Sequence, residues 1–290
     1  MILLTGVTGT IGRATMLRMP PGTALRLLAR EPSAVSDAPP SAELAKAAYS
    51  DQRALLGALR GVSAALLVTT RIDGADDEAF IRAARRAGVR RVVKLSAAAV
   101  EDLGADDAIT RWQRESESLL RGSGLEWTFL RPRSFMSNTL SWAASIRAEE
   151  VVRAVHGASV NTVVDPRDVA RAAVRTLTEP GHARRAYTLT GPEPISAERQ
   201  TAELAELLGR PLRFEELTAE QALAGLRRRY PEAVADALVR SAERQRDGAK
   251  NRVTDTVERL TGRAAGDFRT WAADHLDAFG GARGGATTPS

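Results

Sequence analysis

The chain has 290 residues, a hydrophobic content of 43% and a formal net charge of +5. This length suits an α/β domain with a smaller appended domain. The sequence contains no cysteine, which excludes disulfides and thiol nucleophiles, and its three histidines lack metal-ligand spacing. No apolar run reaches the roughly 18 residues that cross a bilayer, and the first residues do not resemble a signal peptide. We therefore expect a cytoplasmic protein with no bound metal and no membrane partner.

Arginine supplies nearly all of the positive charge, since lysine occurs only at Lys46, Lys94 and Lys250. A basic chain can bind nucleic acid. Basic and acidic residues alternate over residues 222–246, however, and this mixture is typical of a solvated helix surface. We therefore expect no nucleic-acid partner.

Strands and helices alternate through the first half of the chain. Short apolar segments predict buried parallel strands, and amphipathic segments between them predict helices. The strands are expected at residues 2–5, 25–29, 47–49, 64–70, 91–96 and 127–131. The helices are expected at residues 11–19, 52–59, 76–87 and 108–121. This alternation predicts an α/β fold with a Rossmann-type, doubly wound parallel sheet.

The pattern loosens after Pro132. Residues 134–146 are mostly apolar, and the following segments predict strands at 160–164 and 186–190, a helix at 169–178, and a strand near 212–215 within a mainly helical region. We predict a Rossmann NADP-binding domain over residues 1–155, with residues 160–190 packing back onto it. A smaller, mainly helical substrate subdomain is expected over residues 191–279, and a disordered tail over residues 280–290, which are rich in Gly, Ala, Thr and Ser.

A glycine loop follows the first predicted strand directly and opens the first predicted helix. Its sequence is Gly6-Val7-Thr8-Gly9-Thr10-Ile11-Gly12. A dinucleotide pyrophosphate is held by backbone N–H groups and the positive end of a helix, and glycines permit the tight turn and the close approach. The strand–loop–helix context makes this spacing a specific signal. The cofactor contacts expected from the loop are Gly6, Thr8, Gly9, Thr10, Ile11 and Gly12.

The end of the second strand indicates which dinucleotide is bound. Enzymes that use NAD place Asp or Glu there to bind the ribose hydroxyls, whereas this chain has Ala29 followed by Arg30. A guanidinium can grip a 2′-phosphate through paired hydrogen bonds. We therefore predict NADP (NADPH), with Glu31 as the one feature that favours NAD and a solvated loop charge as the alternative for Arg30. Further cofactor contacts are expected from Arg13, Ser33, Asp51, Thr69, Thr70, Ser96 and Pro132.

Several segments resemble one known family. They are Thr5–Gly12, Leu28–Arg30, Ala87–Ser96, Ser123–Pro132, Asp165–Ala170, Tyr187–Glu193 and Val253–Val257. Together they are similar to the NmrA-like NAD(P)-binding proteins, atypical members of the short-chain dehydrogenase/reductase superfamily. The resemblance covers nearly the whole chain. It implies the fold and the cofactor more strongly than the chemistry, because the family contains quinone, azo-dye and ketone reductases beside non-catalytic redox sensors.

The resemblance also locates the catalytic positions. The wider superfamily uses a Tyr, a Lys four residues later and a Ser; here the first two positions hold Ile109 and Gln113, and the third holds Ala97 or Ala98. NmrA-like proteins often have His at the position of Gln113 with Glu four residues later, which corresponds to Glu117. Gln113 can orient a carbonyl or a hydroxyl group but cannot act as an acid. The candidate catalytic residues are Gln113, Lys94 and Glu117. The alternatives are a strand-end charge for Lys94 and a solvated helix surface for Glu117.

A cluster of aromatic and Met side chains lies where the family closes over the nicotinamide. Such a cluster suits a flat apolar substrate, although packing within the subdomain is the alternative. The predicted pocket residues are Trp112, Phe135, Met136, Asn138 and Trp142.

Two functions follow from these observations. The first is an NADPH-dependent reductase of a quinone or another flat aromatic carbonyl compound, with natural-product tailoring as a variant. Its partner would be a small aromatic substrate, and a homodimer is considered. The alternative is a non-catalytic NADP(H)-binding redox sensor that acts through a protein partner, and a non-redox enzyme that keeps the cofactor as structure is a third reading.

Overall fold

The computed structural model describes residues 1–281, so most of the predicted tail at 280–290 lies outside the described residues. The chain divides into two compact units. The first contains residues 1–132, 166–189 and 256–263, and the second contains residues 133–165, 190–255 and the chain from Ala264 onward. These boundaries differ from the predicted ones. The second unit begins directly after Pro132 rather than after residue 155, and a late helical segment returns to the first unit.

A seven-stranded sheet forms the centre of the first unit, in the order β3-β2-β1-β4-β5-β6-β9, and every neighbouring pair is parallel. The strands are β1 (Ile2–Leu4), β2 (Leu25–Ala29), β3 (Glu43–Lys46), β4 (Ala64–Leu67), β5 (Arg91–Leu95), β6 (Glu126–Pro132) and β9 (Arg185–Leu189). The strand order reverses at β1, where β2 and β4 lie on opposite sides. In such sheets the ligand crevice lies at the carboxyl ends of the strands at this reversal. The predicted Rossmann-type fold is confirmed.

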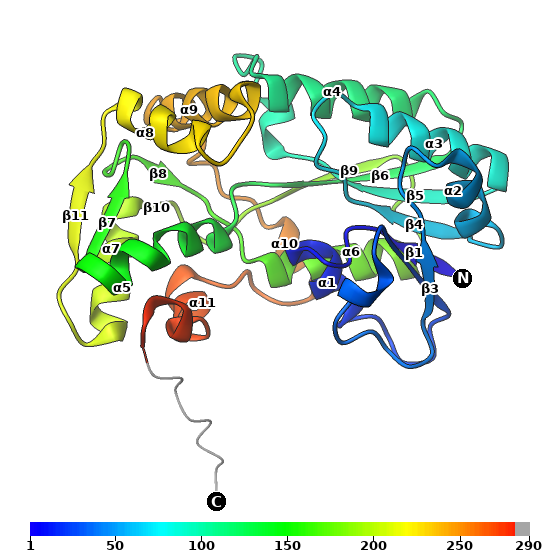
Figure 1. The fold of residues 1–290 in the computed structure, drawn as a ribbon, viewed down its shortest axis with the longest axis horizontal. Helices are drawn as coiled ribbons and strands as arrows, with labels where there is room; N and C mark the ends of the chain where they lie inside the picture. The colour runs from blue at the N-terminus through cyan, green and yellow to red at the C-terminus, as the bar shows by residue number, and fades with distance from the viewer. Residues whose placement is uncertain (282–290) are drawn as a thin grey trace, which may run out of the picture. The chain divides into compact units, whose positions relative to one another are not determined.

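Helices cover both faces of this sheet (Figure 1). The helices α2 (Gln52–Leu59), α3 (Ala75–Ala87) and α4 (Ala108–Arg121) lie on one face. The helices α1 (Thr10–Met16), α6 (Pro166–Thr178) and α10 (Thr256–Thr261) lie on the other. Two 3₁₀ helices, η1 (Pro32–Ala34) and η2 (Ala98–Glu101), follow β2 and β5. The strands read as continuous apolar runs because both faces are buried, as in β4, where Leu66 and Leu67 are fully buried.

The second unit is mainly helical, as predicted. Its elements are η3 (Met136–Trp142), α5 (Ala143–Glu149), β7 (Val151–Ala154), β8 (Val160–Asn161), β10 (Ile195–Ser196), α7 (Ala197–Leu208), β11 (Arg213–Glu216), α8 (Ala219–Arg227), α9 (Glu232–Arg246), α11 (Phe268–Ala273) and η4 (Leu276–Phe279). The strand expected near 212–215 is confirmed as β11, which pairs in parallel with β7, a strand that the sequence analysis did not predict.

Three predicted elements are corrected by the structure. The third strand lies at Glu43–Lys46 rather than at 47–49, because it is an edge strand with exposed polar residues and carries little hydrophobic signal. The strand expected at 64–70 ends at Leu67, where the chain leaves the sheet to line the crevice. The strand expected at 160–164 is reduced to Val160–Asn161, and Val164 forms only an isolated bridge with Phe135.

Candidate active site

The glycine loop connects β1 to α1, and two of its glycines are required by the fold itself. Gly6 has a φ of +65°, and a Cβ atom there would lie 2.9 Å from the Cβ of Val68. A Cβ atom on Gly12 would lie 2.2 Å from the carbonyl oxygen of Gly6. Both distances are shorter than van der Waals contact, so a larger residue would push the loop away from the strand or the helix.

Gly9 differs from its two neighbours in the motif. Its φ is −101°, which any residue adopts, and the nearest atom to a Cβ there would be 3.4 Å away. The folded chain alone therefore does not demand glycine at this position. Gly9 is exposed and lines the cavity beside the loop. Its missing side chain leaves room for a ligand to approach the backbone, as a pyrophosphate requires.

The cavity has a volume of about 490 Å³ and lies at the carboxyl ends of β1, β2 and β4. Six of the predicted cofactor residues line it: Gly6, Thr8, Gly9, Arg30, Thr69 and Thr70. Eight others do not: Thr10, Ile11, Gly12, Arg13, Ser33, Asp51, Ser96 and Pro132. Ile11 and Gly12 are buried behind the loop. Asp51 is the N-cap of α2, where its Oδ1 accepts a hydrogen bond from the Ala54 N–H at 3.0 Å.

Arg30 carries the charge that a 2′-phosphate requires. It lines the cavity, and among residues 1–281 it forms no hydrogen bond or ion pair through its guanidinium. Glu31 points to other partners, because its carboxylate lies 3.8 Å from Lys46 Nζ and accepts a hydrogen bond from Ser33 Oγ at 3.2 Å. The acidic residue that could favour NAD is thus partly neutralised and lies outside the cavity lining.

Arg13 is held away from the role that the sequence suggested. Its guanidinium is paired with Asp37, and this contact lowers the pKa of the Asp37 carboxyl. Both side chains are about half exposed, so solvent weakens this ion pair. Arg30 and Arg71 both line the cavity, and Arg71 is paired with Asp73, so Arg30 is the lining cation that forms no ion pair among residues 1–281.

The sequence analysis missed Tyr49 and Asp76, which both line the cavity. Tyr49 donates its O–H to the carbonyl oxygen of Val68 at 3.1 Å, and its ring meets Phe80 edge-on at 6.3 Å between centroids. Burial raises the pKa of the Tyr49 phenol, and burial likewise raises the pKa of Asp76. Tyr49 lies two residues before Asp51, which was expected to contact the cofactor, so an aromatic residue there was an available signal.

Lys94 is fully buried within β5. Its Nζ donates to Asp77 Oδ1 at 2.7 Å, and it lies 5.3 Å from the centre of the Trp112 ring. Burial lowers the pKa of Lys94, whereas the neighbouring Asp77 carboxylate raises it. The side chain is not a strand-end charge over the sheet, as the alternative interpretation held, but one half of an enclosed ion pair.

Glu117 is also buried, and the solvated-surface alternative for it is wrong. Its Oε1 accepts hydrogen bonds from Ser96 Oγ at 2.7 Å and from Arg131 Nε at 2.8 Å. Its Oε2 accepts from Arg131 Nη2 at 2.5 Å and from Arg121 Nη2 at 2.9 Å. With both oxygens engaged, Glu117 binds Arg131 tightly, and Ser96 is turned toward Glu117.

Among the three catalytic candidates, Gln113 has a hydrogen-bond acceptor that no described residue engages. It is buried on α4, and its Oε1 has no hydrogen-bond partner among residues 1–281. It lies one helical turn before Glu117 and therefore on the same face of α4. A buried acceptor without a partner is unfavourable, and a hydroxyl or amide donor of a bound molecule would satisfy it.

Four of the predicted pocket residues belong to the second unit: Phe135, Met136, Asn138 and Trp142. Met136 is buried in its core among Val163, Ile195, Leu204, Phe268, Trp271 and Phe279, and Trp142 packs against the same core. Met136 and Trp142 therefore contribute to packing within the subdomain, which was the alternative interpretation of this cluster. Phe135 is half-buried, and Asn138 is exposed.

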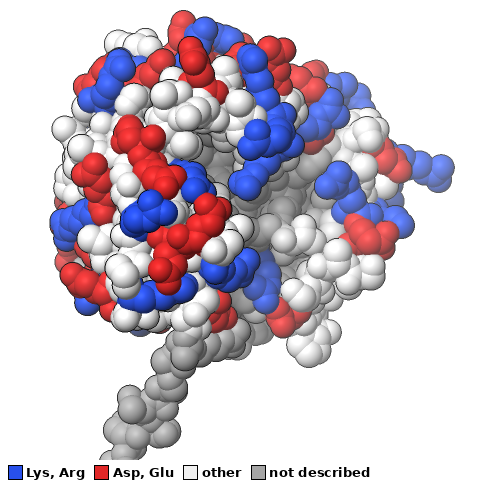
Figure 2. Space-filling view, turned by 60° about the vertical axis from the view of Figure 1, so that its left-hand side comes forward, with Lys and Arg blue, Asp and Glu red and all other residues white. Residues whose placement is uncertain are grey.

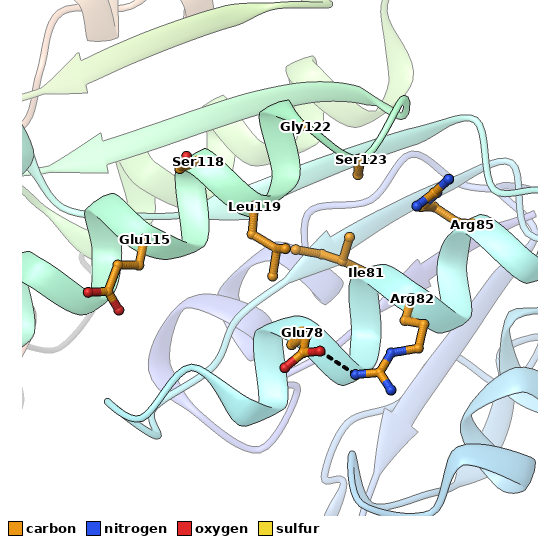
Figure 3. Close-up of a pocket in the computed structure, with 9 residues that line it drawn as sticks. All are labelled: Glu78, Ile81, Arg82, Arg85, Glu115, Ser118, Leu119, Gly122 and Ser123. Carbon is orange, nitrogen blue, oxygen red and sulfur yellow. Dashed lines mark hydrogen bonds and ion pairs between the residues drawn. The ribbon is translucent and has the colours of Figure 1, made fainter.

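Two further surface features lie apart from the predicted site residues. A larger cavity of about 610 Å³ lies between α3 and α4, where the side chains of Ile81 and Leu119 point toward each other beside an ion pair between Glu78 and Arg82 (Figure 3). None of the predicted site residues lines it. On the face in Figure 2, Lys and Arg side chains are interspersed with Asp and Glu. Ion pairs of this kind elsewhere in the described chain include those of Arg227, which lies 3.0 Å from Glu232 and 3.2 Å from Asp236.

The part of the chain that the structure describes contains no group of three or more His, Cys, Asp and Glu residues that could hold a metal ion. No helix within residues 1–281 is both long and apolar enough to cross a bilayer. The parallel sheet, the close-packed glycine loop and the cavity at the strand ends define a Rossmann-type protein of the dinucleotide-binding class.

Comparisons with known proteins specify this class further. Residues 6–180 match the model of the NAD(P)H-binding family. The chain is 52% identical over 279 residues to a (4-alkanoyl-5-oxo-2,5-dihydrofuran-3-yl)methyl phosphate reductase of Streptomyces griseus subsp. griseus, covering 96% of this chain and 99% of the relative. It is 34% identical over 295 residues to an NAD(P)H azoreductase of Xenophilus azovorans, covering 97% of this chain and 100% of the relative.

A solved structure with a similar fold is the NADPH-dependent quinone oxidoreductase of Escherichia coli complexed with NADPH, at 24% identity and a TM-score of 0.83, covering 96% of this chain and 100% of that chain. The chain belongs to the NAD(P)H-binding family, and the resemblance to NmrA-like atypical short-chain dehydrogenases/reductases is confirmed. The protein is an NAD(P)H-dependent oxidoreductase. The family match supports a nicotinamide dinucleotide, NAD(P)H, as the cofactor, and the glycine loop that lines the cavity fits such a dinucleotide.

Proposed function

We propose that the protein reduces a flat acceptor whose hydride adduct is a stabilised anion. The acceptors that fit are a quinone or a carbon–carbon double bond conjugated to two carbonyl groups. The observation that carries the proposal is that Ile109 and Gln113, neither of which can act as an acid, occupy the positions of the usual Tyr and Lys. Lys94 and Glu117, the other candidates, are engaged in buried ion pairs. They are therefore proposed as structural groups rather than acids.

The name of the relative that is 52% identical fits this chemistry. In a 4-alkanoyl-5-oxo-2,5-dihydrofuran, the ring double bond is conjugated to both the lactone carbonyl and the alkanoyl carbonyl. NADPH, when bound, supplies a hydride to the β-carbon of such a double bond. The resulting charge is shared by two carbonyl oxygens, as the charge of a reduced quinone is shared around its ring. Water can protonate such an anion, so the protein need only bind, orient and shield the acceptor.

The residues of the first unit have separate roles in this proposal. Gly9 and Arg30 hold the pyrophosphate and the 2′-phosphate. Gln113 offers its unpartnered Oε1 to a hydroxyl group of the cofactor or substrate. The nearly full-length similarity to proteins named as reductases favours catalysis over the redox-sensor alternative.

The substrate proposal is tested with a panel of acceptors. NADPH oxidation is followed with an alkanoyl-butenolide phosphate, the same compound without its phosphate, a benzoquinone and an unactivated aliphatic ketone. We expect turnover of the doubly activated acceptors and none of the ketone. Comparable kcat/KM values for the ketone would overturn the proposal, because that reaction needs a proton donor. Gln113→Ala should lower kcat with little change in NADPH affinity, and Ser118→Ala, on the exposed side of the same helix, is the control.

Cofactor choice is tested at Arg30. Because Arg30→Glu replaces the cation with a charge that repels a 2′-phosphate, we expect NADPH affinity to fall on the order of 10- to 100-fold while NADH affinity changes little. Arg53→Glu, an exposed position on α2 outside the cavity lining, is the matched control. Equal losses for both cofactors would contradict the assignment.

The cytoplasmic location and the homodimer stay predictions. Cell fractionation tests the location, and size-exclusion chromatography tests the homodimer.

A further inference from the structure

Behind the cofactor cavity, one carboxylate joins three elements of the first unit. Asp77, on α3, is fully buried. Its Oδ1 accepts hydrogen bonds from Lys94 Nζ of β5 at 2.7 Å and from Thr69 Oγ1 at 3.0 Å. Its Oδ2 accepts from Trp112 Nε1 of α4 at 2.8 Å. Both oxygens are therefore satisfied by donors from different parts of the chain.

Stability alone gives little reason for such a cluster in this place. A buried ion pair is often no more stabilising than well-packed apolar residues of the same volume, because both charges lose their hydration. The surrounding sheet offers such packing, since Val92, Val93 and Leu66 are fully buried. Lys94 Nζ does not reach solvent, so it cannot exchange a proton with a substrate directly. What the pair does accomplish is to fix the positions of the two side chains that share Asp77.

Those two side chains face different parts of the site. Thr69 follows β4 and lines the cofactor cavity. Trp112 directly precedes Gln113, whose Oε1 is buried without a partner in the described chain. Trp112 also lies close to the start of α3, because a Cβ atom on Gly74 would be 3.8 Å from its Cδ1. One carboxylate thus holds the cavity wall through one oxygen and the Gln113 helix through the other.

We propose that Asp77 and Lys94 are positioning residues that couple cofactor binding at Thr69 to the placement of Trp112 and Gln113 on α4. The proposal rests on the proposed reductase function. A cofactor that contacts Thr69 changes how firmly Thr69 holds Asp77, and Asp77 transmits that change to Trp112. If this coupling operates, a substitution at Trp112 changes cofactor affinity through the shared carboxylate, and its effect is not independent of a substitution at Thr69.

The test uses substitutions that remove one hydrogen-bond donor each and keep most of the shape. Thr69→Val removes the hydroxyl at the cavity wall, and Trp112→Phe removes the indole N–H. We measure the NADPH dissociation constant by titration and kcat with the best acceptor, for both single variants and the double variant. Trp112→Phe should weaken NADPH binding about threefold although its side chain is not on the cavity wall. The loss of NADPH affinity in the double variant should differ by about threefold or more from the product of the losses in the two single variants.

Controls separate this coupling from a general loss of structure. Trp127→Phe makes the same exchange on β6, where Trp127 stacks on Phe129 and does not line the cavity, and should leave NADPH affinity unchanged. Thr69→Ser restores the donor and should restore affinity. Effects that multiply independently, or an unchanged NADPH affinity in Trp112→Phe, would overturn the proposal. If the wild-type protein binds NADPH but reduces none of the acceptors in the panel, the reductase proposal fails, while the affinity cycle still decides whether Asp77 couples the two sides.

Discussion

Glu117→Gln distinguishes a buried structural carboxylate from a catalytic one. The change keeps the shape but replaces one acceptor oxygen with a donor that faces the Arg131 guanidinium. Glu117 accepts four hydrogen bonds, from Ser96 at 2.7 Å, Arg131 at 2.8 and 2.5 Å, and Arg121 at 2.9 Å. Removing one partner of a buried pair costs about 3–5 kcal/mol.

Two features place the expected loss at the lower end of this range. Arg131 keeps a second carboxylate, Glu101, at 2.9 Å, and Arg121 is 43% exposed, so its contact with Glu117 adds little. We therefore expect a loss of about 3 kcal/mol, which corresponds to a melting temperature lowered by about 6–12 °C.

The assay combines urea unfolding, thermal unfolding and turnover. Turnover is measured well below the unfolding transition of the variant, so that kcat reports on folded protein. The exposed Glu115, two residues away on the same helix, supplies the control Glu115→Gln, which should leave both stability and turnover unchanged. We expect Glu117→Gln to lose stability while kcat stays close to the wild-type value. An unchanged melting temperature together with a large fall in kcat would refute the structural assignment and make Glu117 a catalytic group.

The remaining predictions concern the glycine loop and Tyr49. Gly12→Ala should lower stability by about 1–3 kcal/mol, because its Cβ would lie 2.2 Å from the Gly6 carbonyl oxygen. Gly9→Ala should keep the wild-type melting temperature and still weaken NADPH binding, and equal melting losses in the two variants would contradict this distinction. Burial raises the pKa of Tyr49, so the native state retains a proton that the unfolded state releases above about pH 10. The free energy of unfolding should therefore fall as pH rises through that value. Tyr49→Phe should flatten that decline, and an identical pH profile would exclude Tyr49 as its source.

The sequence alone was sufficient for the fold and for the loop and strand end that line the cavity, because those signals are local. Apolar runs that alternate with amphipathic segments indicate a parallel sheet covered by helices. The glycine spacing from Gly6 to Gly12 is contained in one short segment of sequence. Ala29-Arg30 lies at a strand end whose position follows from the alternation of apolar and amphipathic segments. The polar third strand at the sheet edge escaped this reasoning, since an edge strand needs little hydrophobicity.

The tertiary structure alone decided which charges are available for chemistry. Lys94 and Glu117 could be singled out in the sequence, but their partners Asp77 and Arg131 lie 17 and 14 residues away. Arg13 and Arg30 are equally basic in the sequence, yet only Arg13 has a carboxylate partner among the described residues. A side chain's role depends on its burial and on the partners that the folded sheet brings to it, and no local pattern encodes either.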